Sequence, residues 1–132
     1  MSRVVLDAYS VIAYLEKETG NEQVRSYLER ASESGRDLLL SVVNWGEVYY
    51  IIMREAGHSK AEEIARLLET LPIELVPVDV SLAKQAATFK ASHKMSYADC
   101  FAAALAKLHK ATLITGDKEF KQVEGEIKVH WL

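Results

Sequence analysis

Short apolar runs alternate with longer segments of helical spacing along the whole sequence. Residues 3–6, 37–41, 74–78, 112–115 and 127–131 are rich in Val, Leu and Ile, which predicts five strands. Between them, apolar residues recur three or four positions apart, which predicts helices over 9–16, 21–34, 44–56, 60–71, 80–93 and 97–109 and a short helix over 118–123. Short, continuously apolar strands need helices on both sides of their sheet. The pattern therefore predicts an α/β fold, a three-layer α/β/α sandwich with a largely parallel central sheet.

Length and composition favour one domain. The chain has 132 residues and 49% of them are hydrophobic, which suffices for one core and leaves little room for a second. We assign residues 1–132 to a single domain, and the only cysteine, Cys100, excludes an internal disulfide. No apolar run approaches the roughly 20 residues of a membrane span. The N-terminal segment is too polar for a signal peptide, so we expect a cytoplasmic protein with no membrane partner.

Three acidic residues stand near the carboxyl ends of predicted strands, and a fourth lies in a different local context. Asp7 directly follows the first strand, and Asp117 lies two residues past the fourth. In parallel α/β sheets the functional crevice lies beyond the carboxyl ends of the strands. Glu47 lies in the first turn of the helix predicted after the second strand, and Asp99 opens a helix that follows another helix. These four carboxylates are the candidate functional residues.

Helix capping explains each acid as well as a functional role does. Each has the sequence context of a cap, with Asp7 and Asp117 as N-caps and Asn44-x-x-Glu47 and Ser96-x-x-Asp99 as capping boxes. The two roles are compatible, because one carboxylate can cap a helix and bind a metal ion. If the four converge, they cannot all be ionised cheaply without a cation. Ligands that are all oxygen suit Mg²⁺ or Mn²⁺, and such ions activate water for phosphodiester hydrolysis.

Other enzyme classes lack their motifs in this sequence. None of the patterns GxxxxGK[ST], GxGxxG and GxSxG occurs, and the four histidines lack the spacing of zinc ligands. A phosphatase of the haloacid-dehalogenase type would need an acid at Tyr9, and a response-regulator receiver would need an acid beside Asp7.

Four segments resemble the motifs of PIN-domain nucleases, and among these the VapC-type toxins of toxin–antitoxin pairs. They are VVLDAYSVIA (4–13), SVVNWGEV (41–48), SYADCFAAALA (96–106) and LITGDKEF (113–120), in this order along a chain of the right length. The resemblance implies a PIN-like sandwich and a Mg²⁺- or Mn²⁺-dependent endoribonuclease that acts as the toxin of a VapBC-type pair. It also implies an RNA substrate, a homodimer and a cognate VapB-like antitoxin.

The resemblance also assigns roles to individual residues. It carries the catalytic metal site onto Asp7, Glu47, Asp99 and Asp117, and it implies that Thr115 lends its hydroxyl to the shell around the metal. Many members have Thr or Ser directly after the first Asp. This chain has Ala8 and Tyr9 there, so Ser10 is the nearest hydroxyl that can substitute. The alternative is a catalytically inactive PIN-like module that only binds a partner, and four intact acids argue against it.

Two further features bear on partners. The net charge of −3 argues mildly against binding of nucleic acid by bulk electrostatics. Lys90 and Lys94 form a small basic group with His93, which is read either as a solvated helix end or as a contact with the RNA backbone. The helix predicted over 44–56 carries more apolar surface than one face of a small domain buries, which predicts an interface with a second subunit or an antitoxin helix.

Overall fold

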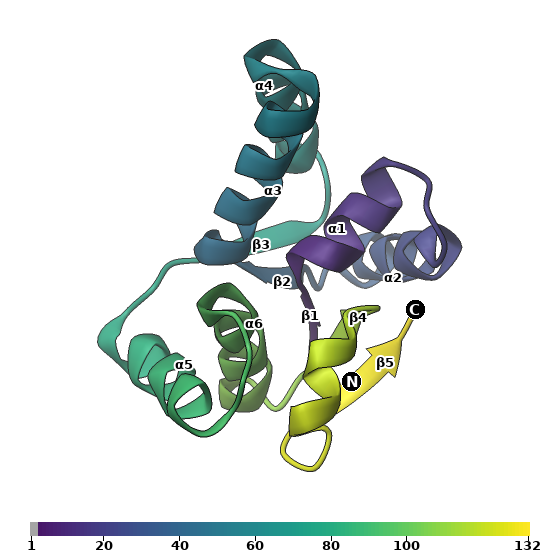
Figure 1. The fold of residues 1–132 in the computed structure, drawn as a ribbon. Coiled ribbons are helices and arrows are strands. Elements are labelled where there is room, and N and C mark those ends of the chain that lie inside the picture. The colour runs from purple at the N-terminus through teal and green to yellow at the C-terminus, as the bar shows by residue number, and fades with distance from the viewer. Residues whose placement is uncertain (1–2) are drawn as a thin grey trace.

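The computed structural model describes residues 3–132, in which helices alternate with strands as the sequence predicts (Figure 1). The elements are β1 (Val4–Leu6), α1 (Ala8–Leu15), α2 (Asn21–Ser34), β2 (Leu38–Ser41), α3 (Val42–Ala56), α4 (His58–Glu69), β3 (Ile73–Val76), α5 (Val80–Ser92), α6 (Tyr97–Leu108), β4 (Thr112–Thr115), the 3₁₀ helix η1 (Lys118–Val123) and β5 (Lys128–Trp131). None of the helices in this part of the chain is long and apolar enough to cross a membrane.

The five strands form one sheet in the order β3-β2-β1-β4-β5, and every neighbouring pair is parallel. The prediction of a largely parallel sheet is confirmed, and the observed sheet is parallel throughout. The chain lays down β1, β2 and β3 in one direction and then returns to place β4 on the other side of β1. The strand order therefore reverses between β1 and β4, and such a switch point opens a crevice at the carboxyl ends of the strands.

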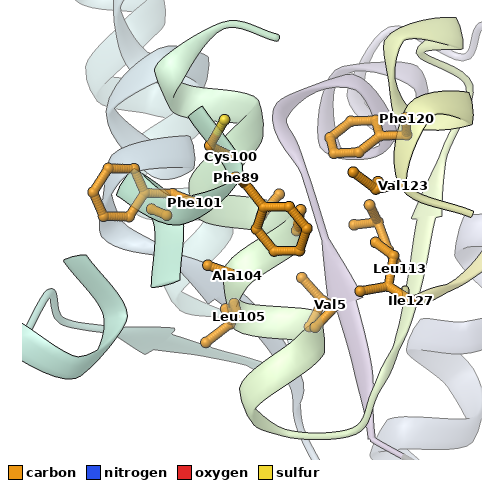
Figure 2. Close-up of a cluster of buried hydrophobic side chains, with 14 of the residues drawn as sticks. Val5, Phe89, Cys100, Phe101, Ala104, Leu105, Leu113, Phe120, Val123 and Ile127 are labelled. Carbon is orange, nitrogen blue, oxygen red and sulfur yellow. The ribbon is translucent and has the colours of Figure 1, made fainter. Parts of the chain in front are cut away.

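Alternate residues of the central strands pack into two separate cores, one on each face of the sheet, which makes the fold a three-layer sandwich. Val5 and Leu113 face a layer formed with α5, α6 and η1, shown in Figure 2, whereas Leu6 and Ile114 face a layer formed with α1 to α4. Successive side chains of a strand point to opposite faces, so a strand buried on both faces must be apolar at every position. The continuous apolar runs in the sequence have this origin.

The helix α6 lies closest to the centre of the molecule. Its residues 102–104, all alanine, are fully buried, and it contacts β1, β2 and β4. Small side chains let its backbone approach the sheet, and this fixes the position of the helix start, where Asp99 lies. Cys100 is also fully buried in this core, where it packs as a small apolar side chain.

Three helices, α1, α3 and α4, start one or two residues earlier than the sequence pattern indicated, and the difference in α3 bears on the site. The helix α3 begins at Val42, because Ser41 is its N-cap and its Oγ accepts a hydrogen bond from the Val43 N–H over 3.2 Å. The predicted start at Asn44 was wrong by two residues, and so was the capping box of Asn44 and Glu47. Glu47 consequently lies in the second turn of α3, where its side chain is free for another role.

Candidate metal centre

The four predicted carboxylates lie together in one cleft at the carboxyl edge of the sheet. A hollow of about 250 Å³ is lined by Asp7, Glu47, Asp99 and Asp117, together with Ala8, Tyr9, Ile12, Glu18 and Ile51. It lies at the switch point, because Asp7 follows β1 and Asp117 follows β4. Residues up to 110 positions apart in the sequence therefore meet through the sheet topology alone.

Asp7 is held rigidly at the start of α1. Its Oδ1 accepts a hydrogen bond from the Ser10 N–H over 2.8 Å, and the Ser10 Oγ accepts one from the Asp7 N–H over 3.0 Å, which completes a capping box. The carboxylate is only 2% exposed. Burial raises the pKa of Asp7 to about 6, although its hydrogen bonds from Thr115 and Ser10 lower it. Asp7 is thus both the N-cap of α1 and a cleft residue.

Thr115, at the end of β4, links the Asp7 carboxylate to the backbone of Asp117. Its fully buried hydroxyl donates to Oδ2 of Asp7 and accepts a hydrogen bond from the Asp117 N–H over 3.0 Å. Asp117 in turn accepts at Oδ1 from the Glu119 N–H over 2.9 Å, which caps η1. The hydroxyls of Thr115 and Ser10 are therefore both hydrogen-bonded to Asp7, and each holds that carboxylate in place.

Asp99 faces two other carboxylates at the start of α6. Ser96 caps that helix by accepting from the Asp99 N–H over 3.1 Å. One oxygen each of Asp99, Asp117 and Glu119 lie within 4.8 Å of one another, and Asp99 is 8% exposed. Burial raises the pKa of Asp99 to about 9, and the neighbouring charge of Asp117 adds to the effect. The metal-free cleft therefore disfavours the charged form of Asp99.

Glu47 reaches the cleft from α3. It is half-buried, and its Oε1 accepts a hydrogen bond from Nδ2 of Asn44 over 2.9 Å. Burial raises the pKa of Glu47, the charge of Asp117 raises it further, and the hydrogen bond from Asn44 lowers it. Its environment is thus less extreme than that of Asp7 or Asp99, and more open to solvent.

Three residues of the site were missed by sequence reasoning. Glu18 lines the cleft from the turn after α1, and nothing in its local sequence marks it. Glu119 stands two residues after Asp117, and this short acidic pair was a usable signal for the cluster with Asp99. Asn44 was read as a helix cap, so its hydrogen bond to Glu47 was not foreseen.

The predicted basic pair does not line the cleft. Nζ of Lys90 donates to the Met95 carbonyl over 2.7 Å and so ties the end of α5 to the following loop. Lys94 is exposed in that loop, and its N–H donates to the side chain of Gln122. The RNA contact of Lys90 and Lys94 stays a prediction.

The chemistry of the cleft fits a hard divalent cation. Every donor that converges there is a carboxylate oxygen, with no His or Cys among the residues lining it. Within residues 3–132, no Lys, Arg or His forms an ion pair with Asp7, Glu47, Asp99 or Asp117. Buried carboxylates without cationic partners are unfavourable unless they are protonated or bind a metal ion. The residues present therefore fit Mg²⁺ or Mn²⁺.

Replacing Thr115 with Val should weaken metal binding with little change in volume. The variant removes the hydroxyl that donates to the Asp7 carboxylate and accepts from the Asp117 backbone N–H, so the Asp7 carboxylate loses a fixed partner and the backbone that carries Asp117 loses a tether. Loss of such orienting partners typically costs about 10- to 100-fold in metal affinity or activity. Calorimetric titration with Mn²⁺ measures the effect. The exposed Thr88, whose hydroxyl bonds only within α5, provides the matched control Thr88→Val. Equal affinity in Thr115→Val and wild type would refute the role.

Comparison with known proteins identifies the class. A model of the PIN domain family matches residues 4–126, so this chain belongs to that family. A search among curated proteins gave no match. Two similar solved structures are VapBC2 from Rickettsia felis bound to a promoter DNA fragment, with a TM-score of 0.76, and DNA-bound VapBC from Salmonella typhimurium, with a TM-score of 0.74; each is 15% identical and covers 98% of both chains. A third is VapC20 from Mycobacterium tuberculosis, described as a sarcin-ricin loop cleaving toxin, with a TM-score of 0.70, 19% identity and coverage of 96% of this chain and 98% of that one. At these identities the likeness shows the fold.

Proposed function

We propose that this chain is a Mg²⁺- or Mn²⁺-dependent endoribonuclease that acts as the toxin of a VapBC-type toxin–antitoxin pair. The observation that carries the proposal is the meeting of Asp7, Glu47, Asp99 and Asp117 in one cleft without a cationic side chain paired to any of them. A fold built only to bind a partner has no need to hold buried, unpaired carboxylates together. The alternative of a catalytically inactive PIN-like module is therefore disfavoured.

The four carboxylates would hold the metal, and each makes a distinct contribution. A bound Mg²⁺ or Mn²⁺ supplies a nucleophilic water and stabilises charge on the scissile phosphate. Asp7 is the most rigid ligand, since Ser10 and Thr115 fix its two oxygens. Asp99 and Asp117 lie with one oxygen each within 4.8 Å of the other, and Glu47 lines the cleft from α3. No side chain lining the cleft is a Ser, Cys or Lys nucleophile, so the residues support hydrolysis by water rather than covalent catalysis.

A VapB-like antitoxin and a second copy of the chain are the proposed protein partners. Several of the similar structures are of VapBC complexes. In this chain, α3 and α4 leave large apolar side chains in solvent, with Tyr50 47% and Leu67 42% exposed. These exposed groups fit the interface predicted from the apolar excess of α3.

Digestion of a total RNA pool tests the proposal. The wild type is incubated with the pool in Mg²⁺, in Mn²⁺ and in chelator, beside Asp7→Asn and the control Glu33→Gln, which removes an exposed charge of α2 away from the cleft. We expect discrete cleavage products from wild type and Glu33→Gln, lost in chelator and lost in Asp7→Asn.

Each other outcome points to a specific error. The same products from Asp7→Asn as from wild type would show a contaminating nuclease or a wrong site. Absence of cleavage together with absence of Mn²⁺ binding would favour the inactive partner-binding module. Mn²⁺ binding that Asp7→Asn abolishes, without cleavage of the pool, would keep the metal centre and reject these RNAs as substrates.

A further inference from the structure

The side chain of Asn44 lies between the two helices that carry Glu47 and Asp99. Asn44 is fully buried on α3. Its Nδ2 donates to Oε1 of Glu47 over 2.9 Å and to the backbone carbonyl of Ala98 over 3.0 Å. Ala98 directly precedes Asp99 on α6. One amide group therefore links the carboxylate of Glu47 to the backbone beside Asp99.

The same amide is incompletely satisfied. Its Oδ1 is buried and has no hydrogen-bond partner in the part of the chain that the structure describes. A buried acceptor without a donor destabilises the fold relative to a satisfied one, so apolar residues are favoured at such positions. Rules of packing and polar satisfaction are broken mainly at functional sites. The residue is therefore better explained by its two donor contacts than by packing.

We propose that Asn44 is a positioning residue, which holds the Glu47 carboxylate in the cleft and sets its place relative to Asp99. The inference rests on the proposed function, because the metal centre is what these two acids serve. Glu47 is half-exposed on a long side chain, and a fixed donor removes the rotamers that turn it toward solvent. A ligand held in this way needs no reordering when the metal ion binds.

Titration with Mn²⁺ tests the role of Asn44. Metal affinity is measured by calorimetry for wild type, Asn44→Ala and Val48→Ala, and thermal melting of each metal-free protein gives its stability. Val48 is the matched control, because it is fully buried on the same helix and packs in the apolar layer with Leu6 and Ile114. We expect Asn44→Ala to bind Mn²⁺ 10- to 100-fold more weakly. We expect Val48→Ala to lose stability and keep the wild-type affinity.

A double-mutant cycle shows whether Asn44 acts through Glu47. If it does, Asn44→Ala should cost little further affinity in a protein that already carries Glu47→Ala. Equal affinities of wild type and Asn44→Ala, or losses that simply add in the double variant, would overturn the inference. If Asn44→Ala does not fold, Asn44→Ser replaces it in the same comparisons. A wild type that binds no Mn²⁺ would instead refute the proposed function, and that outcome is distinct from binding that is insensitive to Asn44.

Discussion

Replacing Asp99 with Asn is expected to abolish RNA cleavage and, in the same protein, to raise the melting temperature of the metal-free fold. Asn has nearly the shape of Asp but no charge, and it can donate hydrogen bonds to the carboxylates of Asp117 and Glu119 that lie beside it. Because burial and the charge of Asp117 raise the pKa of Asp99 to about 9, the metal-free fold must take up a proton there at neutral pH, and Asn removes that cost. The gain is of order 1–3 kcal/mol, or roughly 3–10 °C in melting temperature. Loss of a metal ligand costs activity on the order of a thousandfold.

Activity is expected to fall while the melting temperature rises, and this combination distinguishes a functional carboxylate from a residue that only stabilises a helix. A residue that only caps α6 would lose stability and keep activity when it is changed, because a cap contributes about 1 kcal/mol to its helix. Melting is followed by circular dichroism in chelator, and cleavage is followed on the RNA species that wild type cuts. The control Glu33→Gln changes the net charge equally and should leave both measurements unchanged. A less stable but active Asp99→Asn protein would mean that Asp99 only stabilises the first turn of α6, which Ser96 caps.

The sequence predicted the fold closely because its signals are local and strong. The central strands are buried on both faces and so contain short, continuously apolar runs such as 38–40, whose shortness distinguishes them from the longer helical segments. The break between α3 and α4 was also recognisable, since Gly57 stands there with φ of 92°, in the left-handed region that favours glycine. Helix starts were less secure, because Ser41 belongs to β2 and caps α3 at once.

The site was predictable only where it coincides with the ends of strands. Asp7 and Asp117 follow β1 and β4 directly, so topology alone brings them together. Glu47 lies in the helix that follows β2, so the same rule pointed to it, whereas Asp99 lies in a helix that follows another helix and only the resemblance to a family assigned it to the site. The contacts of Asn44 and Glu18 depend on how α1, α3 and α6 pack, and no periodicity encodes that packing.

The unusual Tyr9 after the first motif has a tertiary explanation of the same kind. Its ring lies against Gly116 so closely that a Cβ on that glycine would be 2.4 Å from Cε1 of Tyr9. The large ring of Tyr9 is accommodated because Gly116 has no side chain, and Tyr9 lines the cleft that Asp117 also lines. The resemblance had indicated a small polar residue at this position, and the neighbour across the cleft explains why a tyrosine fits.

The stability of the metal-free protein is expected to fall as the pH rises from about 4 to 6, and Mn²⁺ should reverse the loss. The pKa of Asp7 is raised from 3.8 to about 6 by burial, so between these values the folded state binds more protons than the unfolded state. The free energy of unfolding then decreases with pH. Asp7 is 2% exposed, and its shift corresponds to about 3 kcal/mol. Asp99, with its pKa raised to about 9, extends the decline above pH 6.

Urea denaturation across this pH range, in chelator and in Mn²⁺, measures the effect. In chelator, Asp7→Asn should be more stable than wild type by an amount that grows from near zero at pH 4 to about 3 kcal/mol at pH 7. In Mn²⁺ the wild type should become the more stable of the two proteins above pH 6. Only its ionised cleft gains binding energy from the metal, by RT ln(1 + [Mn²⁺]/Kd). If the free energies of unfolding of the two proteins changed with pH in parallel in chelator, Asp7 would ionise as freely in the fold as it does in the unfolded chain. The crossing of the curves links the cost of burying the carboxylates to the ion that they are arranged to hold.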